Sequence, residues 1–185
     1  SLFLTGAAGT GKSHVINTLS SLLRQSSASA GFYMTAPTGI AACNIGGQTI
    51  HSWAGIGLGQ EEVERLFYSV AGDKQALKRW KQAKILFIDE VSMMSDVLFD
   101  KLSALGKRIR NDDRIFGGIQ LVLSGDFYQL PPVTKSSNGG GFLFKSREFQ
   151  DEFLDNTVVL DKVFRQKDSA FLKMLHEART GEISE

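Results

Sequence analysis

The sequence predicts a three-layer α/β fold, in which helices cover both faces of a mostly parallel central sheet. Short runs rich in Ile, Leu and Val alternate along the chain with longer segments whose apolar residues recur at helical spacing. Residues 2–4, 85–88 and 119–123 are apolar at almost every position, and strands that are covered on both sides typically have this composition. At 185 residues, the chain fits one domain with a sizeable core.

The first predicted elements are a strand, a glycine-rich loop and a helix. Residues 2–4 form the strand and residues 6–11 the loop, and apolar residues then recur at helical spacing between positions 15 and 23. A second strand is predicted over residues 32–35, and Pro37 ends it.

The middle of the chain is predicted to be mostly helical. Residues 40–45 predict one or two helical turns, and a loop follows through Trp53. Residues 61–82 predict two helices that are separated by Gly72 and Asp73. The end of this stretch carries basic residues that we expect to form an exposed, solvated face: Lys78, Arg79, Lys81 and Lys84.

The second half repeats the alternation, beginning with the buried strand over residues 85–88. The elements predicted after it are, in order, a helix, a strand, a mobile loop, a strand and a helix: residues 98–109, 119–123, 136–141, 158–160 and 171–175.

Composition and charge are those of an ordinary soluble protein. The formal net charge of +1 gives no overall field that would hold a polyanion, so any nucleic-acid contact must come from a local groove. The single cysteine, Cys43, excludes an internal disulfide, and we expect it to be a small buried hydrophobe. No apolar stretch is long enough for a membrane span. Because the chain opens at Ser1 without Met and enters an apolar run at once, we expect it to be part of a longer protein.

The strongest motif lies between the first strand and the first helix. The segment Gly6-Ala7-Ala8-Gly9-Thr10-Gly11-Lys12-Ser13 matches the P-loop pattern of Gly, four residues, Gly, Lys and Ser or Thr. Glycines let the backbone curl so that amide hydrogens point at phosphate oxygens, and the helix start adds a positive dipole end. Lys12 is then expected at the terminal phosphates of ATP, and the Ser13 hydroxyl is expected to be a ligand of Mg²⁺.

Two carboxylates follow the buried strand over residues 85–88. Asp89 and Glu90 therefore lie at the carboxyl end of a parallel strand, where open sheets bind ligands. We expect Asp89 to hold Mg²⁺ through water, beside Ser13, and Glu90 to orient and polarise the attacking water. The alternative is a pair of acids that only complements a helix dipole.

Two further residues are candidates for contacts with the terminal phosphate. Gln129, in Asp126-Phe127-Tyr128-Gln129, follows the third strong strand and can bond the terminal phosphate or its attacking water. Arg165, in Val163-Phe164-Arg165-Gln166, can supply charge to the transition state as an arginine finger does. The alternatives are an ordinary polar loop for Gln129 and a surface ion pair for Arg165.

Taken together, these segments resemble the petite integration frequency family of DNA helicases, which belong to superfamily one. The resembling blocks occur in the family's order: residues 6–13, 35–42, 49–53, 88–94 and 125–133. The run from residues 99–102 through 116–121 is similar to the segment that marks this family, and residues 163–166 are similar to its next motif. The resemblance covers nearly the whole chain.

The resemblance implies a RecA-like motor domain of an ATP-dependent helicase. Such an enzyme moves five-prime to three-prime on single-stranded DNA, acts on structured DNA such as G-quadruplexes, and is linked to DNA repair, recombination, telomeres and mitochondrial DNA. It would work in the nucleus or mitochondrion of a eukaryote, or otherwise in the cytoplasm. We expect a monomer with no membrane partner.

The resemblance also implies a strand channel and roles for single residues. Gln129 and Arg165 would read the terminal phosphate. Thr38 and His51 can donate to backbone phosphates, and Trp53 offers a stacking face for a base, with burial in the core as its alternative. The predicted DNA-binding set is Pro37, Thr38, Gly39, His51 and Trp53.

The family pattern is incomplete in this chain, which lacks the later motifs of a second RecA-like domain and the glutamine-bearing segment upstream of the P-loop. We therefore predict a first motor domain over residues 1–160, and the start of a connection to a second motor domain over residues 161–185. On this hypothesis the isolated chain binds nucleotide and turns it over poorly.

Two other functions share the same phosphate chemistry. One is a P-loop ATPase or phosphotransferase that acts on something other than nucleic acid. The other is a nucleotide-dependent binding module whose ATP state changes an affinity without unwinding DNA. Stimulation of ATP hydrolysis by single-stranded DNA separates the helicase from the first alternative, and loss of function on replacement of Glu90 separates it from the second.

Overall fold

A computed structural model describes residues 1–25, 31–132, 140–164 and 168–181. Six strands form one sheet in the order β3-β2-β4-β5-β1-β6, and every neighbouring pair is parallel. The strands are β1 Leu2–Gly6, β2 Phe32–Ala36, β3 Gln48–Thr49, β4 Ile85–Ile88, β5 Gln120–Gly125 and β6 Thr157–Leu160. The predicted α/β fold with a parallel central sheet is therefore confirmed.

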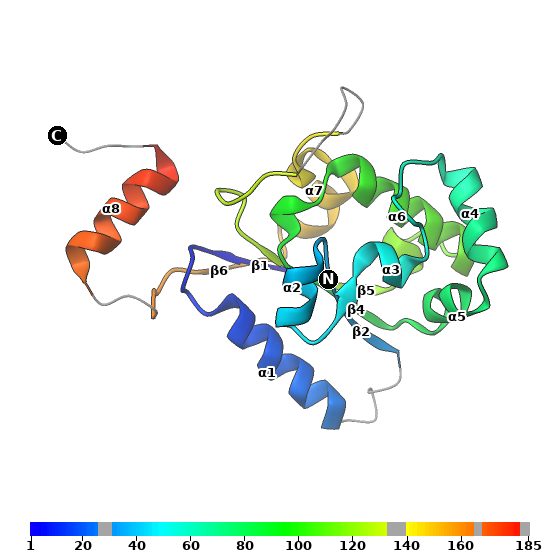
Figure 1. Ribbon diagram of the computed structural model, residues 1–185, viewed down its shortest axis with the longest axis horizontal. Helices are drawn as coiled ribbons and strands as arrows, with labels where there is room; N and C mark the ends of the chain where they lie inside the picture. The colour runs from blue at the N-terminus through cyan, green and yellow to red at the C-terminus, as the bar shows by residue number, and fades with distance from the viewer. Residues whose placement is uncertain (26–30, 133–139, 165–167, 182–185) are drawn as a thin grey trace.

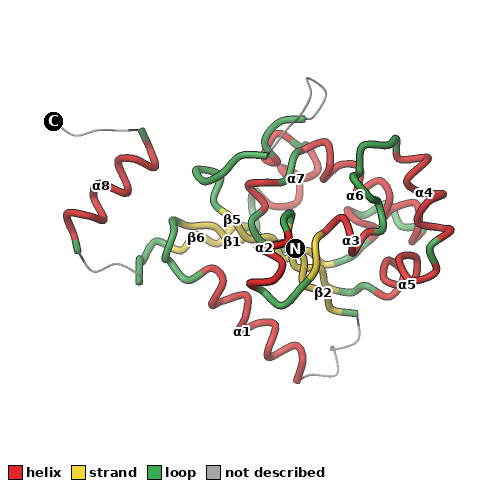
Figure 2. Tube along the Cα trace, in the orientation of Figure 1, coloured by secondary structure: helices red, strands yellow, loops and turns green. Residues whose placement is uncertain are grey.

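Helices connect the strands and lie on both sides of the sheet (Figures 1 and 2). They are α1 Lys12–Gln25, α2 Gly39–Asn44, α3 Ile50–Ala54, α4 Val63–Gly72, α5 Lys74–Gln82, α6 Asp96–Arg110, α7 Arg147–Phe153 and α8 Ser169–Thr180. The described residues also form three short 3-10 helices: η2 Val91–Met93, η3 Ile115–Gly117 and η4 Leu143–Lys145. None of the described helices is long and apolar enough to cross a membrane.

Most of the predicted boundaries follow from local chemistry. Asp73 ends α4, and its carboxylate accepts the amides of Gln75 and Ala76 at the start of α5, so the predicted break between two helices is confirmed. Side-chain caps also start α2, α3, α6 and α7 at Thr38, Thr49, Ser95 and Ser146.

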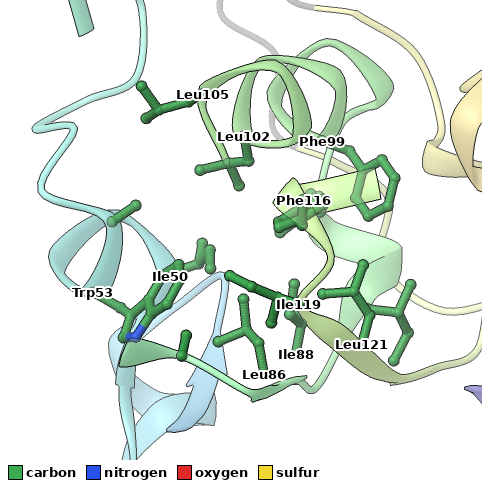
Figure 3. Close-up of a cluster of buried hydrophobic side chains, with 14 of the residues drawn as sticks. Ile50, Trp53, Leu86, Ile88, Phe99, Leu102, Leu105, Phe116, Ile119 and Leu121 are labelled. Atoms are coloured by element: carbon green, nitrogen blue, oxygen red, sulfur yellow. The ribbon is translucent and has the colours of Figure 1, made fainter. Parts of the chain in front are cut away.

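The strands sort their side chains between two cores because successive residues point to opposite faces. On β4, Leu86 and Ile88 belong to the larger core, whereas Phe87 belongs to the smaller one. The larger core packs the sheet against α3 to α7, and the smaller core packs it against α1 and α2. Figure 3 shows the part of the larger core that lies between β4, β5, α3 and α6. Covering on both faces explains why these strands are apolar at successive positions.

Several local predictions were wrong. The stretch before and including Trp53 is not a loop but strand β3 followed by helix α3, and helix α7 was not predicted. Cys43 is exposed, because α2 turns Ala41 and Ala42 toward the sheet and leaves the next position outside. Most of the loop predicted over residues 136–141 lies outside the described residues.

The stretch that resembles the family-marking segment forms a rigid corner between α6 and η3. Phe99 and Phe116 are fully buried and pack ring against ring, with centroids 5.1 Å apart. The Ser103 hydroxyl accepts the Phe116 amide at 3.2 Å and donates to Glu148 on α7. Phe116 has φ +51°, a left-handed conformation that bulky residues rarely adopt. This corner is therefore held by packing and hydrogen bonds.

Gly106 lets the two parts of this corner approach closely, and we predict that Gly106→Ala destabilises the fold by about 1–3 kcal/mol through overpacking. A Cβ at Gly106 would lie 2.7 Å from the Phe116 carbonyl carbon, which is backbone and cannot move aside. Denaturant unfolding of the purified chain measures the change in free energy.

Gly72→Ala is the matched control, because it is also a helical Gly→Ala change but meets nothing within 4 Å. Here the better helix propensity of Ala should stabilise the fold by roughly 0.5–1 kcal/mol. Equal effects at the two positions would show that the close approach at Gly106 does not matter.

Candidate active site

The predicted phosphate and DNA motifs gather at one edge of the sheet. The P-loop follows β1, Asp89 and Glu90 follow β4, and residues 126–129 follow β5. Because β4, β5 and β1 are parallel neighbours, their carboxyl ends lie side by side at this edge. The segment that begins at Pro37 follows β2, which is the next strand along.

The P-loop takes a conformation that needs glycine. Gly6, Gly9 and Gly11 have φ of +148°, +82° and +97°, in the region that L side chains rarely adopt. A Cβ at Gly6 would also lie 2.3 Å from the Leu160 carbonyl oxygen on β6. The loop is thus closely packed against β6 and leads directly into α1 at Lys12.

Lys12 is buried at the centre of this loop. Its Nζ donates to the carbonyl oxygens of Gly6 at 2.7 Å and Ala7 at 3.1 Å. Burial lowers the pKa of Lys12 below its ordinary value. Three nearby carboxylates oppose that effect: Asp126, Glu90 and Asp89. Lys12 therefore lies among acidic side chains that partly offset the effect of burial on its pKa.

Asp89 and Glu90 end β4 in two different environments. Asp89 is only 5% exposed, and its amide donates to the Thr35 carbonyl at 2.9 Å. Glu90 has φ 52° and ψ 43°, a left-handed conformation that costs roughly 1–2 kcal/mol for an L residue. Burial, followed by the neighbouring charge of Asp89, raises the pKa of Glu90. Strain and a raised pKa at one residue are typical of a functional site.

Asp126 accepts several hydrogen bonds at the start of the loop after β5. It is 1% exposed and accepts the Tyr128 amide at 3.2 Å and the Gln129 side-chain amide at 3.3 Å. Arg179, near the end of α8, donates to both of its carboxylate oxygens, at 2.9 and 3.0 Å. Burial alone would raise the pKa of Asp126, but the bonds from Arg179 and its other donors lower it below its usual range.

Two adjoining cavities open over these residues. One, of about 470 Å³, is lined by the P-loop and Lys12 together with Glu90 and Gln129. The other, of about 400 Å³, is lined by Thr38 and Asp89 among others. Ser13, Glu90 and Gln129 line both. The structure therefore brings together the predicted phosphate, metal-ligand and hydrolytic residues, and it places Thr38 beside them.

Among the predicted strand-contacting residues, Thr38 and His51 keep polar groups near the surface. The Thr38 hydroxyl accepts the Ala41 amide at 3.3 Å and so caps α2, and a hydroxyl that accepts one bond can still donate another. His51 is partly exposed on α3, and burial lowers its pKa. Burial thus favours the neutral ring of His51, which is suited to a hydrogen bond rather than an ion pair. Pro37 and Gly39 flank Thr38 at the start of the same helix.

The stacking interpretation of Trp53 is wrong. Trp53 is 0% exposed, and its ring packs against Trp80 with centroids 4.6 Å apart. Arg79 holds the same turn by donating to the carbonyl oxygens of Trp53 at 2.7 Å and Ser52 at 2.9 Å. Because the short helix α3 turns Trp53 toward the sheet, the ring serves the core that was its alternative. Arg79 is likewise a structural residue rather than part of a solvated face.

Arg165 lies outside the described residues, so its predicted role stays a prediction. Phe164, the residue before Arg165, does contact the P-loop, since its amide donates to the Gly9 carbonyl at 2.9 Å. Phe164 also lines the cavity of about 470 Å³.

Sequence reasoning missed Asp126 and Arg179 as residues of this site. Asp126 was visible as a carboxylate at the carboxyl end of a strand, the same signal that identified Asp89. Arg179 had no such signal, because it lies 53 residues from Asp126 and outside every matched motif.

The match of the family model for PIF1-like helicases covers residues 1–185 of this chain. The chain belongs to the PIF1-like helicase family. Curated relatives include the ATP-dependent DNA helicase PIF1 of Candida albicans, 45% identical over 99% of this chain, and RRM3 of Saccharomyces cerevisiae, 43% identical over 99%. PIF1 of Homo sapiens is 42% identical over the whole chain. This PIF1-like chain spans 21%, 25% and 28% of the length of these three relatives.

Solved structures of Pif1 helicases have the same fold. The crystal structure of the Candida albicans Pif1 helicase superimposes with a TM-score of 0.93 at 46% identity, over all of this chain and 42% of that one. A Bacteroides Pif1 bound to single-stranded DNA matches with a TM-score of 0.79 at 30% identity, and this chain covers 43% of it. Bacteroides Pif1 has also been solved with ADP-AlF3 and single-stranded DNA. The predicted RecA-like fold and family resemblance of this PIF1-like chain are thereby confirmed.

We predict that Glu90→Gln stabilises this PIF1-like chain at neutral pH. The pKa of Glu90 is raised above the ordinary glutamate value of about 4.5. The carboxyl therefore favours the folded state below about pH 4.5 and loses that contribution as pH rises through the folded pKa. Gln keeps the shape and never ionises. The stability of the variant relative to wild type should therefore increase from pH 4 to pH 8, as measured by denaturant unfolding at each pH.

Glu62→Gln is the control for this measurement, because Glu62 is exposed and caps no amide with its side chain. Its effect should stay within about 0.5 kcal/mol at every pH. A stability difference for Glu90→Gln that does not change with pH would contradict the burial of an ionised Glu90.

Proposed function

We propose that this chain is the first motor domain of a DNA helicase, which binds ATP with Mg²⁺ and hydrolyses it to move along single-stranded DNA. The observation that carries the proposal is the shared lining of two cavities by Ser13, Glu90 and Gln129, between the P-loop on one side and Thr38 on the other. A site that reads phosphate therefore adjoins the segment expected to hold a nucleic-acid backbone.

The P-loop residues would hold the phosphate chain of ATP. Amide hydrogens of the curled loop and the start of α1 provide donors and a positive dipole end. Lys12, which now donates to two loop carbonyls, would turn its Nζ to the terminal phosphates. The surrounding carboxylates oppose the effect of burial on its pKa and so favour the charged form that would bind the phosphates.

The residues present also fit a magnesium ion. Ser13 and Asp89 line the same cavity, and hydroxyl and carboxylate oxygens are the ligands that Mg²⁺ prefers. When bound beside the phosphates, the ion would neutralise charge that develops during phosphoryl transfer. Asp89 is held for this role because the Asp89 amide is bonded to β2 and its side chain is buried.

Glu90 and Gln129 would act on the attacking water. The strained backbone of Glu90 aims its carboxylate into the cavity shared with Lys12, and its raised pKa makes it a better proton acceptor than an ordinary glutamate. Gln129, held by its bond to Asp126, can orient the water or sense the terminal phosphate. A second domain, including its phosphate-sensing arginine, would close the site, with Arg165 as a further charge.

Thr38, Gly39 and His51 would contact the DNA strand. In this proposal, closing and opening of the domains around ATP moves the strand five-prime to three-prime. Support comes from the Bacteroides Pif1 structure with bound single-stranded DNA, which shares this fold. From the family resemblance we also propose action on structured DNA, as a monomer, in the nucleus or mitochondrion of a eukaryote or otherwise in the cytoplasm.

The first test separates nucleotide binding from turnover. We predict that Lys12→Ala weakens ATP binding at least about tenfold, since it removes a buried charge from the phosphates. Glu90→Gln should keep ATP affinity within about threefold of wild type and lower turnover by about 100-fold or more, the scale of losing a general base. Equilibrium binding and steady-state hydrolysis measure the two effects. Unimpaired hydrolysis by the E90Q variant would overturn the role of Glu90.

The second test concerns the nucleic acid. In the full-length protein, we predict that single-stranded DNA raises the rate of ATP hydrolysis at least about tenfold, because strand binding favours the closed domains. His51→Ala should raise the DNA concentration needed for half of this effect by roughly threefold or more, through loss of one hydrogen bond to the strand. A hydrolysis rate that DNA does not change would favour a P-loop ATPase with another substrate.

A further inference from the structure

The ion pair between Arg179 and Asp126 joins the C-terminal helix to the phosphate site. Arg179 Nε donates to Asp126 Oδ2 at 3.0 Å, and Arg179 Nη2 donates to Asp126 Oδ1 at 2.9 Å. The guanidinium also lies 4.4 Å from the centre of the Tyr128 ring. A two-pronged bond fixes orientation as well as distance, so α8, which lies beyond the β6 side of the sheet (Figure 1), reaches back to the loop after β5.

The first consequence of this pair concerns charge. Asp126 is buried, and among the charged groups that act on Lys12 it has the largest effect. An unpaired carboxylate so close to the P-loop lysine would repel the phosphates of ATP, and it would do so strongly because little water screens it. Arg179 balances the charge of this carboxylate by donating to both of its oxygens.

The second consequence concerns geometry. Asp126 Oδ2 accepts both Arg179 Nε and the side-chain amide of Gln129, at 3.0 and 3.3 Å. Gln129 is itself exposed and lines both cavities. Because exposed glutamines sample several rotamers, its direction depends on the carboxylate that anchors it. Arg179 fixes that carboxylate and, through it, the glutamine that would read the terminal phosphate.

We propose that Arg179 is a positioning residue for recognition of the terminal phosphate, acting through Asp126 on Gln129 and on the charge balance of the site. This inference rests on the proposed function, since it concerns the same ATP site. It also gives α8 a role in that function. This helix follows the predicted phosphate-reading segment at residues 163–166, and Arg179 bonds it to the other such segment, at residues 126–129. Release of this bond would separate α8 from the loop after β5.

A positioning role for Arg179 and a role only in docking α8 predict different effects of substitution. If Arg179 serves the charge of the site, its removal weakens ATP binding because the Asp126 carboxylate is left unpaired. Removing that carboxylate as well should then restore ATP affinity. If Arg179 serves geometry, an arginine-to-lysine change should keep the charge but lose the fork that orients Asp126. Neither result follows from loss of packing alone.

The test measures the affinity of the purified chain for fluorescent N-methylanthraniloyl analogues of ATP and ADP, with Mg²⁺ present. Arg179→Ala should weaken ATP binding about tenfold and ADP binding less, which reduces the preference for ATP. The double variant Arg179→Ala with Asp126→Asn should return ATP affinity to within about threefold of wild type. Arg179→Lys should keep ATP affinity within about threefold but lower the preference for ATP over ADP.

Arg65→Ala is the matched control, because Arg65 also forms an ion pair, with Glu61 at 3.1 Å, but on an exposed face of α4. It should leave both affinities unchanged. Far-ultraviolet circular dichroism and thermal unfolding check that each variant is folded. If Arg179→Ala does not fold, Arg179→Lys decides, and an unchanged preference for ATP in that variant would overturn the inference.

The outcomes also separate this inference from the proposed function. If the wild-type chain binds neither analogue, the ATP site itself is wrong. If wild type binds ATP, Lys12→Ala weakens binding and Arg179→Ala behaves as wild type, the proposed ATP site is supported and the proposed role of Arg179 is wrong. A double variant as weak as Arg179→Ala would also overturn the inference, because the arginine would then act only by docking α8.

Discussion

The parallel pairing of β1 with β5, and of β5 with β4, is the constraint on which the rest of the structure depends. Parallel neighbours must end at the same edge of the sheet, so segments that are more than a hundred residues apart in the chain become neighbours in space. This pairing positions the P-loop, the carboxylates after β4 and the loop that carries Gln129. The helices provide the burial that keeps it fixed.

The site concentrates features that oppose folding. Glu90 is held in a left-handed conformation, burial lowers the pKa of Lys12 and raises that of Glu90, and Asp126 is buried as a charge. Such features persist only where surrounding structure enforces them. Here the enforcement comes from backbone bonds to neighbouring strands and from Arg179. The chemistry of the site and its local instability therefore have the same origin.

The two parts of the chain that resemble family-specific segments serve different purposes. The corner of α6 and η3 lies in the larger core, where Phe99, Ser103 and Phe116 hold it against α7. The segment around Phe164, by contrast, bonds directly to the P-loop. A family-marking sequence thus need not line a binding site. In this chain it contributes to the larger core, which also buries Trp53 of α3.

The sequence by itself determined every described strand except β3, most helices and the core of the nucleotide site, because these depend on local signals. Glycine spacing, apolar strands and capping residues act over a few positions, and they located Lys12, Ser13, Asp89 and Glu90. The tertiary structure alone decided what depends on direction and long-range approach. It buried Trp53, exposed Cys43 and placed Arg179 on Asp126, because the way a short helix faces and the partner of a distant arginine are set by packing.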